Sequence, residues 1–195
     1  TPYKRDLEKA QAELAQCAYA KELDKYPLQM HWVSEVPDEE KYALLFQSNM
    51  AEIGMKVEIT KSPWLSVVEE TSKLETSPHI VTVYVSADLP EAGLMLKQRY
   101  HSSTANTWQQ NEWLLDPELD ADLEDALATM DEAQRYEKYK AIQRKLVDNA
   151  VSIWVYDQVE KRAVRSCVDF PATRGATSML MGYYFFVPEI GVDCQ

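Results

Sequence analysis

The chain has 195 residues, of which 46% are hydrophobic, and this is enough for one globular domain with a sizeable core. Its 32 acidic and 20 basic residues give a formal net charge of -12, which argues against a nucleic-acid partner because such binding depends on neutralising phosphates with Lys and Arg. No apolar run approaches the roughly 20 residues that span a bilayer, and the N-terminus lacks the layout of a signal peptide. Because the sequence opens on Thr1, we expect a processed or excised piece, so this absence does not fix its localisation.

The first part of the chain alternates predicted helices and strands. Helical spacing of apolar residues indicates a helix over 4–19, and alternation with a period of two predicts strands over 28–33 and 56–61. Between those strands, Pro37 and the acids after it start a second helix, and Gly54 is expected to end it in a left-handed conformation. The expected apolar stripe of that helix is Tyr42, Leu45, Phe46, Met50 and Ile53. A strand–helix–strand order predicts that the two strands are parallel.

A third helix and a third strand follow, and the strand leads to an acidic residue. Ser62 and Pro63 predict a helix that begins at Trp64 and carries Leu65, Val68 and Leu74 on its apolar face. Trp64 lies at a strand-to-helix junction, where core packing and ligand contact are equally open readings. The strand over 79–85 runs into Ser86 and Asp88. Ligands of open α/β sheets sit beyond the carboxyl ends of strands, so Asp88 is a candidate ligand residue, and the alternative is that it caps the helix predicted over 90–100.

The second part of the chain is predicted to be mainly helical. A polar loop over 101–112 holds Trp108 and is followed by Trp113. Two helices come next and are expected to pack on the sheet, with the apolar faces Leu119, Leu123, Leu127 and Met130, and then Tyr139, Ile142, Leu146 and Ala150. Strands are predicted over 152–156 and 160–168. The predicted fold class is α/β with a mixed, partly parallel sheet flanked by helices, in which residues 1–170 form one lobe and 171–195 are irregular.

The cysteines and histidines match no motif for catalysis or metal binding. Cys17, Cys167 and Cys194 are far apart and form no CxxC pair, so no metal site is expected and at most one internal disulfide can form. Cys17 falls on the apolar face of the first helix, where burial is expected. Phosphate-binding, nucleophile-elbow and zinc-protease motifs are absent, and His101 is expected at the loop surface. We therefore expect neither enzymatic activity nor a cofactor. The alternatives are a small α/β enzyme using Cys167 or a histidine, and an interaction module that exposes Trp108 and Trp113 together.

Aromatic residues gather near the predicted strand ends and the polar loop. They are Trp64, Tyr84, Tyr100, Trp108 and Trp113. An aromatic-lined recess with one carboxylate suits an organic ligand that bears an amine or hydroxyl groups.

Four segments in a fixed order resemble a known class of binding protein. They are residues 3–19, the run Leu45 to Glu58, the run Asp116-Pro117-Glu118-Leu119-Asp120, and residues 132–146 with Arg135, Tyr139 and Gln143. Their order and spacing are similar to the second lobe of the peptide/nickel (family 5) class of extracytoplasmic solute-binding proteins, which serve ABC importers. The likeness extends from about Tyr3 to Phe186.

The resemblance implies a function and a set of site residues. Asp88 would face an inter-lobe cleft and pair with a ligand's α-amino group, and Val85 and Ala92 depart from the class pattern on either side of it. The implied ligand is an oligopeptide or similar small solute, and a sugar is the alternative. The expected ligand-binding residues are Asp88, Ser86, Tyr84, Trp64, Trp108 and Trp113. The implied partner is a membrane permease of the ABC type, reached through a full-length, monomeric, periplasmic or extracellular protein that includes a first lobe.

Overall fold

The three parallel strands of the sheet are those that the sequence predicts. The computed structural model describes residues 3–23, 25–86, 91–157, 163–169 and 190–194. Strands β1 (Leu28–Val33), β2 (Val57–Ser62) and β3 (Ile80–Val81) form a sheet of order β2-β1-β3, with both pairings parallel. The predicted α/β class and the strand–helix–strand unit are therefore confirmed. Strand β3 is shorter than expected, because its pairing with β1 ends at His31 and Val81.

Two helices cover opposite faces of this sheet. Helix α2 (Asp38–Glu52) packs Ala43 against Met30 and Trp32 of β1. Helix α3 (Trp64–Glu70) lies on the other face, where Glu70 contacts His31. The chain moves from β1 through α2 to β2 on one side, and then from β2 through α3 to β3 on the other side of β1. Because both connections are expected to be right-handed and they run in opposite directions across the sheet, their helices lie on opposite faces.

The predicted apolar faces of α2 and α3 are correct only in part. Leu45, Leu65 and Leu74 are exposed, whereas Ala43 and Val67 are buried. Fewer of the large apolar side chains on these helices are buried than the sequence predicted. At the end of α2, Gly54 has φ +81, which confirms the predicted left-handed cap.

Helix α1 (Leu7–Ala15) buries none of its own side chains. The chain just before it is joined to α2 at the surface by Arg5, which pairs with both carboxylate oxygens of Glu52 at 2.7 Å. The predicted burial of Cys17 is wrong: the helix ends two residues earlier, and Cys17 lies exposed in the turn that follows.

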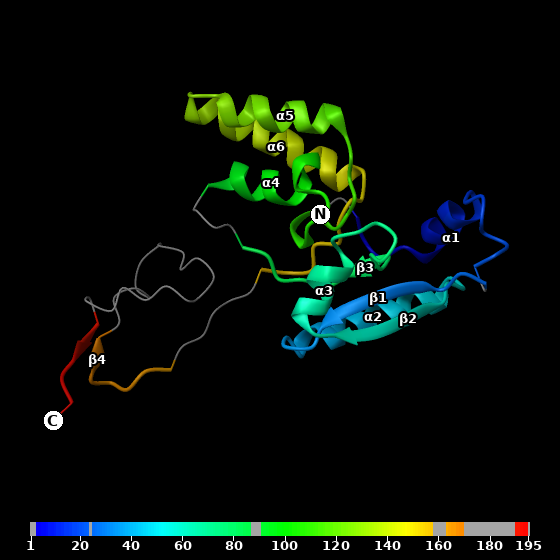
Figure 1. Cartoon of the computed structure of the whole chain (residues 1–195), viewed down its shortest axis with the longest axis horizontal. Helices are drawn as coiled ribbons and strands as arrows, with labels where there is room; N and C mark the ends of the chain where they lie inside the picture. The colour runs from blue at the N-terminus through cyan, green and yellow to red at the C-terminus, as the bar shows by residue number, and fades with distance from the viewer. Residues whose placement is uncertain (1–2, 24, 87–90, 158–162, 170–189, 195) are drawn as a thin grey trace.

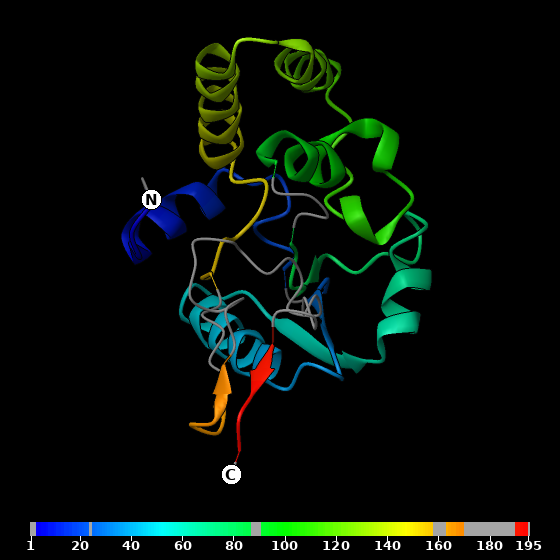
Figure 2. The same cartoon turned by 90° about the vertical axis from the view of Figure 1, so that its left-hand side faces the viewer.

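The remaining long helices form a second unit, which lies apart from the sheet in both views (Figure 1 and Figure 2). It contains α4 (Ala92–Tyr100), the short 3-10 helices η1 (Ser102–Thr104) and η2 (Trp108–Gln110), α5 (Pro117–Ala128) and α6 (Glu132–Asp148). Its buried core is Leu96, Tyr100, Leu119, Leu123, Ala126, Tyr139, Ile142 and Leu146. The prediction that α5 and α6 pack on the sheet is wrong, because their apolar faces pack against each other and against α4. Met130, beyond the end of α5, is 92% exposed.

The C-terminal part departs furthest from the predicted elements. Residues 152–156 form no strand, and Ile153 and Val155 are exposed. Among residues 163–168, the described part of the strand predicted over 160–168, only Val168 falls in a strand, β4 (Val168–Asp169), which pairs antiparallel with β5 (Gly191–Val192). A disulfide joins Cys167 to Cys194 beside this pair. The domain boundary near residue 170 stays a prediction, since 170–189 lie outside the described residues. No helix among the described residues has the length and apolar character to span a membrane.

Candidate functional site

The carboxyl ends of the three parallel strands bring together the residues after them. Glu35 follows β1, Trp64 follows β2, and Tyr84 and Ser86 follow β3. Because parallel strands end at one edge of a sheet, side chains distant in sequence meet there. We call this region the carboxyl edge. It contains three of the six residues that the sequence analysis selected.

Trp64 is fixed at the start of α3 by a carboxylate from the neighbouring strand end. Glu35 accepts the backbone N–H of Trp64 at 3.1 and 3.2 Å, and Ser34 Oγ donates to Glu35 Oε2 at 2.8 Å. These bonds, with that of Ser34 first, lower the pKa of the Glu35 carboxyl. Sequence reasoning missed Glu35, since its partner lies 29 positions away.

Trp64 meets Trp108 from the helical unit. Their ring centroids are 4.9 Å apart at an interplanar angle of 75°, which is an edge-to-face pair. Trp108 lies on η2, and its carbonyl accepts a hydrogen bond from Arg99 Nη1 at 3.2 Å. The two indoles are each half-buried. The pair thus joins the sheet unit to the helical unit and leaves aromatic surface exposed.

Tyr84 belongs to a second aromatic group, which the sequence did not reveal. Its hydroxyl is hydrogen-bonded to that of Tyr156, and Tyr156 also packs against Tyr42 of α2 with centroids 5.7 Å apart. The Tyr84 and Tyr156 rings lie at 90°, with centroids 6.1 Å apart. Burial first, and then the bond to Tyr156, raise the pKa of Tyr84 far above its ordinary value. Tyr84 therefore presents a neutral hydroxyl group across the physiological range.

A buried ion pair holds the loop that carries Trp108. Arg99 Nη2 donates to Glu112 Oε1 at 2.9 Å and to Asn111 Oδ1 at 3.0 Å, and the same Glu112 oxygen accepts from Ser152 Oγ at 2.9 Å. Arg99 is only 7% exposed. These bonds connect the loop to the segment that leads to Tyr156. The network therefore supports both aromatic groups from the helical side.

Trp113 is not part of either aromatic group among the described ring contacts. Its backbone has φ 53, in the left-handed region, and its indole N–H is buried without a hydrogen-bond partner. Trp108 and Trp113 are both half-buried. They are therefore neither fully exposed together nor fully buried in two separate cores. The tryptophan docking patch of the interaction-module alternative stays a prediction.

The segment after β3 connects the carboxyl edge to α4. Ser86 is half-buried there, and Asp88 lies outside the described residues. The N-cap of α4 is Glu91, which accepts the N–H of Leu94 at 2.9 Å. Glu91 therefore caps α4, which is the alternative role that the sequence analysis considered for Asp88.

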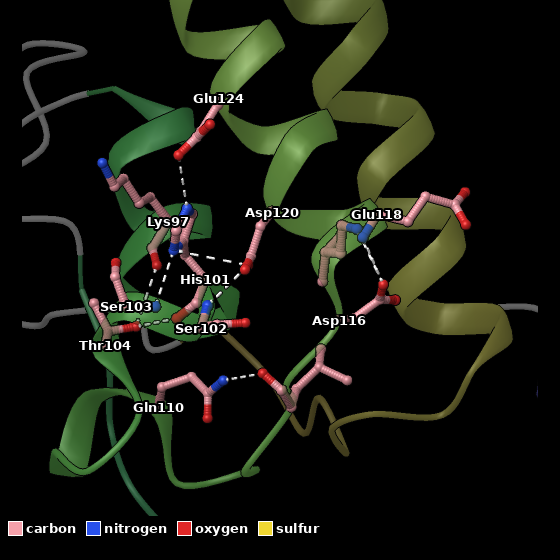
Figure 3. Close-up of polar contacts among 12 residues, drawn as sticks. Lys97, His101, Ser102, Ser103, Thr104, Gln110, Asp116, Glu118, Asp120 and Glu124 are labelled. Atoms are coloured by element: carbon pink, nitrogen blue, oxygen red, sulfur yellow. Dashed lines mark hydrogen bonds and ion pairs between the residues drawn. The ribbon is translucent and has the colours of Figure 1, made fainter.

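The expected surface position of His101 is wrong. His101 is 8% exposed, and its Nδ1 accepts the backbone N–H of Ser103 at 3.0 Å (Figure 3). A ring nitrogen that accepts an N–H carries no proton, so this bond favours the tautomer with hydrogen on Nε2, which lies 3.4 Å from Glu124 Oε1. The ring is buried because it caps η1 beneath α5, where Asp120 accepts the N–H of Ser102 at 2.8 Å.

The remaining histidines and cysteines form no catalytic relay among the described residues. His31 Nδ1 is 2.8 Å from Glu70 and 3.3 Å from Ser62 Oγ, whereas a serine relay needs the acid and the nucleophile on different ring nitrogens. His79 Nδ1 accepts the N–H of Gln29. Cys167 is in a disulfide and is not a free thiol. No group of three or more His, Cys, Asp or Glu side chains in the described ranges is arranged to hold a metal ion.

Comparison with solved structures identifies the fold. The chain superimposes on part of DppA from Helicobacter pylori, an ABC transporter-associated periplasmic binding protein in complex with the peptide STSA, with a TM-score of 0.66 and 22% identity over 77% of this chain. NikZ from Campylobacter jejuni, in complex with Ni(L-His), matches with a TM-score of 0.63 and 20% identity over 76% of this chain. A dipeptide-binding protein from Pseudoalteromonas sp. SM9913, in complex with Met-Leu, matches with a TM-score of 0.64 and 24% identity over 75% of this chain.

These matches cover only part of each longer protein. The chain spans 28% of DppA, 31% of NikZ and 29% of the dipeptide-binding protein. No protein-family model and no curated protein sequence matches the chain. The chain therefore has the fold of one part of these binding proteins, as the order of its sequence segments predicted.

Proposed function

We propose that the chain is the ligand-binding second lobe of an extracytoplasmic solute-binding protein of the peptide/nickel class. It would capture an oligopeptide or similar small solute in a cleft between two lobes and deliver it to an ABC permease. The observation that carries the proposal is the coincidence of this fold with a carboxyl edge rich in aromatic side chains, where α/β sheets bind ligands. In this role the lobe binds its ligand without transforming it.

The disulfide supports an extracytoplasmic location. Cys167 and Cys194 are joined, and disulfides persist in oxidising compartments such as the periplasm. A location outside the cytoplasm is where a binding protein meets its solute before import. The full-length protein would work as a monomer that meets the permease at the membrane.

The proposed binding residues divide into two roles. Trp64 and Trp108 would supply apolar contact area through their paired rings, and Tyr84 and Ser86 would supply hydroxyl groups. Asp88 would contribute the charge that pairs with a ligand amine, as the resemblance implies. Trp113 is retained as a proposed member on sequence grounds. Closure of a second lobe would bury the ligand more completely, so this lobe alone should bind weakly.

A sugar is the second candidate ligand. The hydroxyl groups of Tyr84 and Tyr156 are hydrogen-bonded beside exposed ring surface, and the raised pKa of Tyr84 keeps the Tyr84 hydroxyl neutral. Aromatic faces with adjacent hydroxyl groups suit a neutral polyhydroxylated solute. Such a ligand would use Asp88 as a hydrogen-bond acceptor rather than as a countercharge.

Titration with defined probes tests the proposal. Tryptophan fluorescence and calorimetry would follow binding of the peptide Ser-Thr-Ser-Ala, the dipeptide Met-Leu and maltose to the chain. We expect weak, saturable binding of a peptide, lost in Asp88→Ala and weakened about tenfold in Trp64→Ala, since an aromatic contact of 1.4 kcal/mol corresponds to a factor of about ten. Binding of maltose alone would favour the sugar alternative.

The control substitution lies beside the site. Leu65→Ala changes the residue after Trp64 on the same helix, and Leu65 is 79% exposed. This variant should bind like the wild type. Equal loss of binding in Leu65→Ala and Trp64→Ala, or saturable binding that no change at Trp64, Trp108 or Asp88 affects, would remove the carboxyl edge from the proposal.

A further inference from the structure

One buried acid at the carboxyl edge has no part in the function proposed so far. Glu39, in the first turn of α2, is 2% exposed. Its Oε2 accepts two hydrogen bonds, each of 2.8 Å, from the backbone N–H of Val33 and from Oγ1 of Thr82. The carboxyl group therefore connects the end of β1 to the chain just beyond β3.

These bonds mark the point at which β3 leaves β1. The last regular bond between the two strands runs from the N–H of Thr82 to the carbonyl of His31, at 3.0 Å. In a continuing parallel ladder, the N–H of Val33 would donate to a carbonyl of the neighbouring strand. Glu39 Oε2 takes that hydrogen instead and also binds the Thr82 side chain. Glu39 thus occupies the position where the pairing would continue, and the strands separate around it.

Thr82 is two residues before Tyr84 and four before Ser86. The parallel register of β1 and β3 ends at His31 and Val81, so the Glu39–Thr82 bond is an attachment at the base of the segment that carries both residues. Tyr84 then reaches Tyr156 in the segment that follows α6. The direction in which this segment leaves the sheet therefore depends on where Glu39 holds Thr82.

The surroundings of Glu39 make its charge state important. Its Oε1 is buried without a hydrogen-bond partner, and no described ion pair includes it. Burial is the largest influence on the Glu39 carboxyl and raises its pKa, against the bonds from Val33 and Thr82. The charged or titratable side chains on the adjoining elements are engaged with other partners: Lys41 pairs with Asp38, Glu70 with His31, Tyr84 with Tyr156, and Glu35 with the N–H of Trp64.

We propose that Glu39 is a positioning residue whose carboxyl group, bonded to Val33 and Thr82, separates β1 from β3 and directs Tyr84 and Ser86 into the carboxyl edge. Ionisation would place an unpaired charge in a buried site, which costs free energy unless the segment from Thr82 moves and admits water. The carboxyl edge would then change shape with pH. This inference rests on the proposed function for the meaning of the edge, but its test needs no ligand.

Fluorine NMR of the chain labelled with 3-fluorotyrosine measures the effect at Tyr84. The Tyr84 resonance is identified by its loss in Tyr84→Phe. In the wild type we expect this resonance to shift with pH, with a midpoint above the ordinary glutamate value of about 4.3. Glu39→Gln should abolish the shift. The control Glu40→Gln, at an exposed position next in sequence, should retain it. A wild-type shift that persists unchanged in folded Glu39→Gln would overturn the proposal.

A second pair of variants decides the question if Glu39→Gln does not fold. Thr82→Val removes the hydroxyl that binds Glu39, and Thr82→Ser keeps it. We expect the pH-dependent shift of Tyr84 to fall by at least half in Thr82→Val and to persist in Thr82→Ser. Equal shifts in the two variants would contradict the positioning role. If no probe binds but Tyr84 still responds to Glu39, the proposed function fails while the positioning role stands.

Discussion

Glu35, two residues beyond β1, holds the backbone N–H of Trp64 at the start of α3, with both carboxylate oxygens within 3.2 Å. The bond joins the ends of β1 and β2 and fixes the residue whose ring pairs with Trp108. Removing the charge should therefore affect both the start of α3 and the pH dependence of stability.

Glu35→Gln should lower stability at neutral pH and have little effect in strong acid. The pKa of Glu35 is lowered from 4.5 in the folded state, so its contribution is fully present above pH 4.5 and is lost as the pH falls through the folded value. Urea unfolding at pH 7 and pH 2 measures the difference. A variant that differs from the wild type equally at both pH values would show that the carboxylate charge is not responsible.

Gly93→Ala should destabilise the helical unit by about 1–2 kcal/mol, because overpacking costs about 1–3 kcal/mol and a helical alanine returns less than about 1 kcal/mol. A Cβ at Gly93 would overlap the Tyr139 hydroxyl and lie 2.8 Å from Leu127 Cδ2. Burial raises the pKa of Tyr139 to about 12, so its hydroxyl stays protonated and donates to Glu91 at 2.8 Å. Urea unfolding checks this, with Gly191→Ala as control, where the nearest atom is 3.4 Å away.

Leu123→Ala and Met130→Ala should differ sharply although both residues lie on the apolar stripe predicted for α5. Leu123 is 0% exposed, so Leu123→Ala should lower the free energy of unfolding by about 2–5 kcal/mol through lost burial and a cavity. Met130 is 92% exposed, so Met130→Ala should change the free energy of unfolding by less than about 0.5 kcal/mol. Thermal and urea unfolding provide both values. Similar costs would mean that α5 is rotated relative to the core described above.

Arg99→Met should cost about 3–5 kcal/mol, because it leaves Glu112 as a buried charge without its partner. The double variant Arg99→Met/Glu112→Gln should recover part of that loss, since the uncompensated charge is gone. A double-mutant cycle by urea unfolding gives the coupling. Additive single effects would indicate that the 2.9 Å ion pair contributes little to stability.

One thiol should react before reduction and three after it. Cys17 is exposed, and Cys167 is bonded to Cys194. Maleimide labelling followed by mass spectrometry should place a single adduct on Cys17, and Cys17→Ser should remove it. Labelling of Cys167 in the unreduced chain would contradict the disulfide.

Local patterns were sufficient to predict the sheet. The strand over 28–33 was predicted with the bounds of β1, and Gly54 was predicted as the cap that it forms. Both depend on alternation or on one residue type at a helix end, which neighbouring positions reveal. The parallel pairing follows because a helix separates the strands.

The site was only partly predictable, because its contacts join distant segments. Glu39 was interpreted as an acid at a helix start, although a spacing of four residues places it on the same face as the buried Ala43. Tyr156 was missed because its segment was predicted to be a strand, whereas its ring meets Tyr84 72 positions away. The burial of His101 likewise depends on α5, which follows it by more than a dozen residues.

The two buried clusters of the described residues share no member: one lies between α2 and the sheet, the other among α4, α5 and α6. Side chains that share a core unfold together, so two cores define two cooperative units. Native-state hydrogen exchange should then give two classes of amide protection, with Leu146 in one and Trp32 in the other. A substitution that loosens the helices would leave the amides of the sheet protected, and the carboxyl edge would lose its helical half before its strands open.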